Sequence, residues 1–241
     1  MPALSHIRTR RIFRAACLVA LALACVHTAR AQAEGDEEEE KKNPYGTGLG
    51  AQVLLTNSGF GLGGYYHHTL TASMSFLTEM SLGAGKDERE VAFFDRFGQK
   101  DIPNKANYLL MLPAQVGVQQ RLFKESIEDN FRPYLQLSSG PTLGWEYPYF
   151  RDDNDNGVLD DGERIYDSLG ALPKGRLRLG LGGTVALGAQ FGRSRKTAQG
   201  VRLGYTFTYF FDGIQLLEPD IQEARHFFGS PTISVLFGKL F

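Results

Sequence analysis

Cysteine, net charge and long apolar runs are all scarce in this sequence. Its 241 residues include two cysteines, Cys17 and Cys25, and both lie in one apolar run near the N-terminus. If that run is removed on export, no thiol remains, and stability depends on hydrogen bonds and burial instead of disulfides. No later stretch holds about 18 or more apolar residues, which excludes a helical membrane protein. The net charge of -1 argues against nucleic acid as a partner.

The first 45 residues have the composition of an export signal followed by a tether. A basic stretch precedes the apolar run of residues 15–26, and small residues follow at Ala29, Ala31 and Ala33. We therefore predict a signal peptide in residues 1–31, with cleavage after Ala31 or Ala33. An uncleaved membrane anchor is one alternative, but the apolar run is short and ends in a good cleavage site. Lipoprotein processing before Cys25 is another, but alanine stands three residues before it, where leucine is usual. Residues 32–45 are strongly acidic and have no apolar surface to bury, so they predict a flexible tether.

From about residue 46 the hydrophobic pattern has a period of two and continues to the end of the chain. In residues 176–191 one face is apolar, while the other carries arginine, glycine, threonine and glutamine. Successive side chains of a strand point to opposite sides, so this segment is a strand with one apolar face. Similar patterns occupy residues 48–56, 60–69, 72–82, 108–122, 133–147, 201–211 and 232–241. The sequence therefore predicts an all-β domain, residues 46–241, of eight antiparallel up-and-down strands.

The predicted strands suit a transmembrane β-barrel better than a soluble one. A tilted strand needs roughly 9–11 residues to cross a membrane, and these segments are about that long or longer. Their apolar faces are rich in Leu, Phe and Tyr, and the opposite faces hold many glycines and few charges. A soluble eight-stranded barrel of the lipocalin kind remains the competitor, because alternation alone does not say which face points inward.

The last strand has a distinctive end. From Ile233 to Phe241, apolar residues alternate back from a terminal aromatic residue, with Lys239 as the one departure. This segment resembles the C-terminal assembly signal of bacterial outer-membrane barrels. With the predicted signal peptide and eight strands, residues 46–241 resemble the small OmpA/OmpX-like barrel superfamily. The resemblance implies an integral protein of the Gram-negative cell outer membrane that contacts membrane lipid and lipopolysaccharide. It also implies recognition by the barrel-assembly machinery through Phe241, and it specifies no activity.

The lengths of the links agree with this topology. From a periplasmic N-terminus, the links at residues 57–59, 87–104, 149–173 and 212–229 fall outside the cell, and three of them are the longest in the protein. External loops of such barrels are longer than periplasmic turns. The same parity returns the C-terminus to the periplasm.

One motif is specific. Residues 152–163 match the twelve-residue calcium loop of EF-hand and dockerin-type sites, with Gly157 at the sharp turn, although flanking helices are missing. Calcium prefers six to eight oxygen ligands, which predicts a Ca²⁺ site that orders the loop. An acidic loop kept only for solubility is the alternative. The predicted ligands are Asp152, Asn154, Asn156, the backbone of Val158, Asp160 and Glu163.

Charged residues also occur on the faces predicted to line the lumen. Since an eight-stranded barrel leaves room only for side chains, we expect a hydrogen-bonded plug around Glu79 rather than a pore. The arginines expected to face the lumen with it are Arg121, Arg176, Arg178 and Arg202.

The preferred function is a non-enzymatic structural or surface-interaction role, with a surface protein as a further partner. Aromatic residues in the predicted external links either pack the loops onto the outer leaflet or onto one another, which is the simpler interpretation, or mark such contacts; they are Phe93, Phe94, Phe97, Phe227 and Phe228. The alternatives are a small-solute channel and an outer-membrane enzyme that hydrolyses lipid or peptide, with His67 or His226 as general base.

Overall fold

The structure is a computed structural model, which describes residues 47–71, 73–91, 93–94, 100–127, 130–154, 156–160, 163–166, 170–191, 197–220 and 223–240. The predicted signal peptide, the predicted tether and Phe241 lie outside the described residues. None of the described residues belongs to a helix long and apolar enough to cross a membrane.

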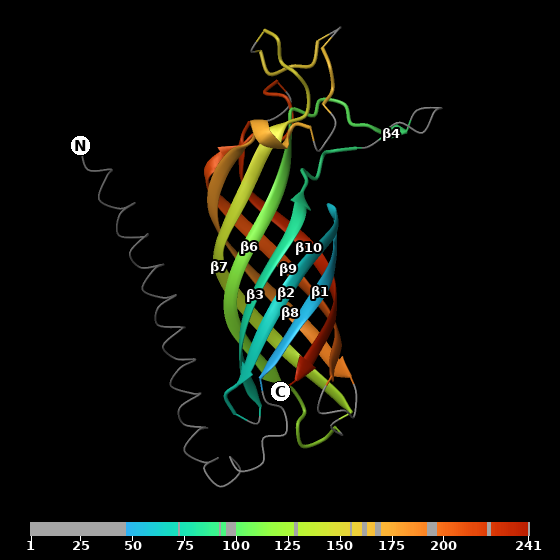
Figure 1. The fold of residues 1–241 in the computed structure, drawn as a ribbon, viewed down its shortest axis with the longest axis vertical. Helices are drawn as coiled ribbons and strands as arrows, with labels where there is room; N and C mark the ends of the chain where they lie inside the picture. The colour runs from blue at the N-terminus through green and yellow to red at the C-terminus, as the bar shows by residue number, and fades with distance from the viewer. Residues whose placement is uncertain are drawn as a thin grey trace, which may run out of the picture. The chain divides into compact units, whose positions relative to one another are not determined.

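Eight long strands form a single closed barrel (Figure 1). Every pair of neighbours is antiparallel, and β1 pairs with β10 to close the ring, which confirms the predicted eight-stranded up-and-down topology. The strands are β1 (Gly48–Thr56), β2 (Gly59–Thr69), β3 (Met74–Gly85), β6 (Asn107–Arg121), β7 (Phe131–Pro148), β8 (Arg176–Phe191), β9 (Thr197–Ile214) and β10 (Arg225–Leu240). A small sheet of β4 (Phe93–Phe94) and β5 (Lys100–Asp101) and the 3-10 helix η2 (Leu172–Lys174) lie in the links.

The apolar face of each strand is the outer wall of the barrel. On β8 and β9 the outward side chains of Leu181, Leu187 and Leu203 are more than half exposed, at 54%, 57% and 57%. The alternate positions, such as Thr184 and Arg202, point into the lumen and are buried. Side chains of a soluble barrel have the opposite arrangement, so the structure favours a transmembrane barrel over a soluble one.

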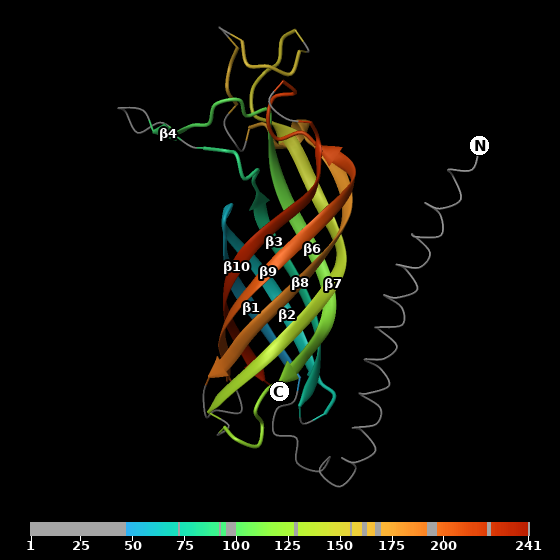
Figure 2. The same cartoon turned by 180° about the vertical axis from the view of Figure 1, so that it is seen from behind.

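The barrel wall is lower on one side. We call the end that carries the links at residues 57–58, 86–106, 149–175 and 215–224 the upper end, as it is drawn in Figure 1. Strands β1 and β2 have 9 and 11 residues, whereas β7 and β9 have 18. Their hairpin therefore stops short of the upper ends of β6 and β7, as Figures 1 and 2 show. Above Thr232, β10 pairs with β9 alone.

The predicted start of the last strand at residue 232 and the predicted fourth link are wrong. Strand β10 begins at Arg225 and β9 continues to Ile214, so Phe227 and Phe228 belong to a strand and not to a loop. Gly229 and Pro231 concealed the strand, since both residues weaken strand patterns. Proline is tolerated here because this part of β10 has a partner strand on one side only.

Candidate functional site

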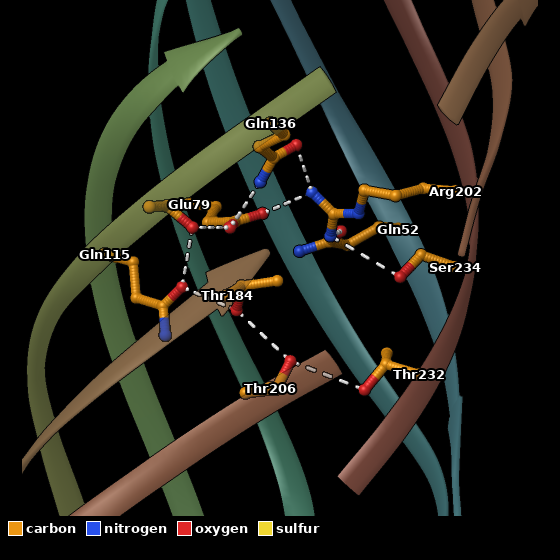
Figure 3. A network of polar contacts seen from close by, with 10 residues as sticks. Gln52, Glu79, Gln115, Gln136, Thr184, Arg202, Thr206, Thr232 and Ser234 are labelled. Atoms are coloured by element: carbon orange, nitrogen blue, oxygen red, sulfur yellow. Dashed lines mark hydrogen bonds and ion pairs between the residues drawn. The ribbon is translucent and has the colours of Figure 1, made fainter. Parts of the chain in front are cut away.

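A buried ion pair crosses the middle of the lumen (Figure 3). Arg202 Nη1 of β9 lies 2.8 Å from Glu79 Oε2 of β3, and both side chains are less than a tenth exposed. Arg202 also donates to Gln136 Oε1 at 2.8 Å and to Gln52 Oε1 at 2.6 Å. A buried charge is tolerated when it is paired and hydrogen-bonded; Arg202 is paired with Glu79, and both of its terminal nitrogens donate hydrogen bonds.

The hydrogen bonds continue from Glu79 around the barrel wall. Glu79 Oε1 accepts bonds from Gln136 Nε2 and from Ser138 Oγ, each at 2.9 Å. Gln115 Oε1 lies within hydrogen-bond distance of the hydroxyls of Ser138 and Thr184, at 2.8 and 2.9 Å. With Ser234, which accepts a 3.4 Å bond from Arg202, the network links residues from every barrel strand except β2. This network, which we call the lumen plug, confirms the predicted plug around Glu79.

The four arginines predicted to face the lumen differ in position and in partner. Arg202 is the partner of Glu79, while Arg178 pairs with Glu146 at 2.7 Å near the upper end. Arg121 lies at the lower end of β6, where its backbone N–H donates to Ser73 at 2.7 Å, and Arg176 is exposed. Sequence reasoning missed the uncharged members of the plug, although they too alternate with outward apolar residues. They are Gln52, Gln115, Gln136 and Ser138.

The long links at the upper end pack together into a structure that we call the cap, formed by residues 86–91, 100–106, 149–166 and 215–220 where they are described. Lys105 Nζ lies 2.5 Å from Glu90 Oε2, and both side chains are almost fully buried. Arg225 of β10 lies 2.9 Å from the buried carboxylate of Asp87. Backbone bonds join the second and fourth links, for example from Glu218 N to Asn104 O at 2.9 Å.

Apolar side chains lie beneath and inside the cap. Phe210 and Phe228 meet edge to face at 5.7 Å within a buried cluster that also includes Leu109, Ile214 and Leu216. A second cluster is formed by Ala106, Tyr149 and Phe150. The prediction that Phe228 is an exposed loop residue is therefore wrong, because its position on β10 points it inward onto Phe210. Phe93 is 58% exposed, as expected, whereas the side chain of Phe94 and the whole of Phe97 lie outside the described residues.

The predicted calcium loop is folded onto its own oxygen atoms. The Asp152 carboxylate accepts bonds from the backbone nitrogens of Asn156 and Gly157, at 3.2 and 2.7 Å. Gly157 has a φ of +75°, the left-handed conformation that favours glycine at the turn. The Glu163 carboxylate accepts from the backbone nitrogens of Asp153 and Asp160, at 2.8 and 3.1 Å.

The donor types suit Ca²⁺, but the oxygens do not converge as a finished site. Asn154 Nδ2 and Asn156 Nδ2 both donate to Asp160 Oδ2 at 2.8 Å, so their amide oxygens point elsewhere. Among the described residues, no group of three or more His, Cys, Asp or Glu side chains stands at metal-binding separations. Carboxylate, amide and backbone oxygens are nevertheless the ligands that Ca²⁺ prefers, and Asn154 and Asn156 need only turn their amides to offer oxygen. The Ca²⁺ site therefore stays a prediction.

One contact of this loop was not predictable from the motif. Glu218 of the fourth link is buried, and its Oε1 accepts a 3.0 Å bond from Leu159 N. The motif loop and the fourth link are thus parts of one cap.

The histidines proposed as general bases contact aromatic rings and backbone in the described part of the chain. His67 points into the lumen, is 4% exposed and stacks near Tyr65 at 6.3 Å. His226 is in β10 rather than in a loop; its Nδ1 lies 2.9 Å from the backbone oxygen of Phe210, and its ring stacks on Tyr209 at 5.6 Å. Among the described residues, neither histidine ring is hydrogen-bonded to a carboxylate or a serine. The geometry gives no support to the hydrolase alternative.

Taken together, these features define a closed, antiparallel eight-stranded barrel with an apolar outer wall, a plugged lumen and an ordered cap. No protein-family profile and no characterised protein sequence matches the chain.

Several solved barrels are similar in structure. Neisserial surface protein A is 12% identical, with 83% of this chain and 98% of that one covered and a TM-score of 0.41. Ail, the attachment invasion locus protein of Yersinia pestis, is 10% identical, with 81% and 96% covered and a TM-score of 0.39. The N-terminal β-barrel domain of Pseudomonas aeruginosa OprF is 11% identical, with the same coverage and the same TM-score as Ail. At these values the similarities carry no argument about activity.

Proposed function

We propose that this chain is an integral outer-membrane barrel with a non-enzymatic surface-interaction role, in which the cap is the contact surface and Ca²⁺ orders its third link. The observation that carries the proposal is the outward-facing apolar wall around a plugged lumen. The wall fits a lipid environment, the lumen plug removes an open aqueous path, and the cap is the part of the molecule left to meet a partner.

The outer wall supports the membrane location in detail. The outward positions of β8 and β9 form contiguous apolar surface, and a soluble monomer rarely exposes such a patch. Aromatic residues flank this surface: Phe131 and Phe191 form a pair at 5.5 Å near the lower end, and Phe211 and Phe227 are exposed towards the upper end. Two aromatic girdles around an apolar band are the arrangement of outer-membrane barrels.

The buried ion pairs of the cap support its role as a fixed surface. Lys105–Glu90 joins the two ends of the second link and Arg225–Asp87 ties this link to β10, so a partner meets an ordered shape and less conformational entropy is lost on binding. The exposed apolar side chains of Val91 and Ile165 on the cap, and of Phe93 in β4, are suited to contact with a protein partner. Lipopolysaccharide is the partner expected around the rim.

Calcium would act on the base of the third link. Arg151 N donates to Arg164 O at 2.8 Å, and Phe150 pairs with Ile165, so the motif loop closes on a short antiparallel bridge. A cation bound by Asp152, Asn154, Asn156, the Val158 carbonyl, Asp160 and Glu163 would neutralise the carboxylates that this bridge brings together.

Trypsin tests the proposal, because Arg151 and Arg164 flank the loop. For the protein in lipid vesicles, we expect Ca²⁺ to slow cleavage at both sites, and the variant Asp152→Asn/Glu163→Gln to be cleaved at one rate with or without Ca²⁺. Asp220→Asn, an exposed acidic residue of the fourth link, is the matched control and should keep the Ca²⁺ effect. Equal cleavage of the wild type in Ca²⁺ and in chelator would reject the calcium proposal.

A further inference from the structure

The lumen is not filled evenly. Between the lumen plug and the apolar cluster under the cap lies a cavity of about 80 Å³. Glu79, Arg202 and Gln115 form its floor, and Met111 and Phe228 line its upper part. This space is large enough to hold more than one water molecule.

The cavity reaches the low side of the barrel wall. Its lining includes the turn residues Asn57 and Ser58 of the β1–β2 hairpin, Lys86 just after β3, and Ser230 of β10. Above that turn, β10 has no strand partner on the β1 side, and the Arg225–Asp87 ion pair bridges from β10 to the segment after β3. We call this opening the window: the hairpin turn lies below it, β3 and β10 lie beside it, and the ion pair lies above it.

The deep end of the cavity offers hydrogen bonds without a protein partner. The Gln115 side chain is 3% exposed, and its Nε2 has no partner among the described residues. In Figure 3, the Gln115 Oε1 atom takes part in the network, whereas the Nε2 atom at the other end of the amide does not. Nearby, Thr184, Thr206 and Thr232 form a row of hydroxyls at 3.1 and 3.4 Å. A buried amide end without a partner costs free energy, which a ligand's polar group can recover.

Between its polar floor and the polar residues that edge the window, the cavity has apolar walls formed by Leu54, Met111 and Phe228. The surface beside the window is apolar as well, because the outward side chains of Phe60 and Phe227 are 78% and 50% exposed. Arg202 and Glu79 neutralise each other on the floor, so the deep end favours an uncharged polar group.

From the polar floor and the apolar walls of the cavity, we infer that it is a binding site for a neutral amphiphile, meaning an uncharged hydrogen-bonding head group with an aliphatic chain. The amphiphile enters through the window from the outer leaflet. The head group meets Gln115 and the threonine row, and the chain lies against Met111 and Phe228 and leaves through the window. This inference rests on the proposed membrane location.

Methionine methyl NMR can test the site directly, with octan-1-ol as the probe and the protein in lipid nanodiscs. The sequence has four methionines, of which Met111 faces the cavity and Met80 lies on the outer wall, 54% exposed. We expect the Met111 methyl signal to shift to a saturating value as octan-1-ol is added. The Met80 signal should drift without saturation, as simple partition into lipid requires.

Two variants and one control define the site. Ser81→Phe places a ring in the cavity from β3 and should abolish the saturable shift of Met111, whereas Thr78→Phe on the outward face of β3 should leave it unchanged. Thr206→Val keeps the side-chain shape, removes one hydroxyl and should raise the half-saturating concentration about fivefold.

The outcomes separate this inference from the membrane proposal. A spin label on the lipid acyl chains should broaden Met80 and spare Met111. If Met80 is not broadened, the membrane location is wrong. If Met80 is broadened but Met111 never shows a saturable shift, or shows the same one in Ser81→Phe, the cavity holds water only and the inference is overturned.

Discussion

Replacing Arg202 with methionine should destabilise the barrel by about 3–5 kcal/mol, the usual cost of removing one partner from a buried ion pair. Methionine fills much of the same space, so the loss comes chiefly from electrostatics and hydrogen bonding. The variant leaves the Glu79 carboxylate, whose side chain is 7% exposed, without its cation, and it removes the bonds to Gln136 and Gln52. The free energy of unfolding can be measured in lipid vesicles by urea titration, with the folded fraction read from gel mobility without boiling.

The double variant Glu79→Gln/Arg202→Met isolates the charge contribution. With no buried charge left, it should be more stable than Arg202→Met alone, which is the signature of coupled neighbours. Arg176→Met is the matched control, because that arginine is exposed at the upper end of β8, and its effect should stay within about 0.5 kcal/mol. A loss below about 1 kcal/mol for Arg202→Met, or a double variant less stable than the single one, would refute the account of the plug.

Three further results are expected. Phe228→Ala should cost about 3–5 kcal/mol because it empties the cluster around Phe210, while the outward Phe227→Ala should cost far less in the same urea titration. Lys105→Met should leave the Glu90 carboxylate buried and unpaired, and so speed proteolysis of the second link; an unchanged cleavage rate would show that this ion pair does not hold the cap. In planar bilayers the wild-type protein should give no steady unit conductance, because the lumen plug crosses the barrel, and well-defined open levels would restore the channel alternative.

The strands could be located from the sequence because their outward faces obey one simple rule. A strand in contact with lipid on one side and a packed lumen on the other must alternate, so the whole of β8 and the central part of β9 follow from the sequence pattern. The rule failed at the top of β10, where Gly229 and Pro231 interrupt the alternation although the strand still pairs with β9. It also overlooked that Phe228 points inward.

The lumen plug was predictable in kind but not in detail. A glutamate and several arginines on inward faces imply a paired charge, yet the choice of Arg202 over Arg121 or Arg178 depends on the stagger of the strands around the ring. The cap was beyond sequence reasoning, since Lys105–Glu90 and Glu218–Leu159 join separate parts of the long links through tertiary contacts. The window has a similar origin, because it arises from the different heights of neighbouring strands.

We propose that the outward apolar wall faces lipid and that the plugged lumen does not. Photolabelling with a lipid that carries a diazirine on its acyl chain, followed by mass spectrometry, reads both faces of one strand in a single experiment. Label is expected on Leu203 and Phe207 of β9, and none on Arg202 or Thr208. Label on the inward residues, or no label on the barrel in intact vesicles, would contradict this proposal.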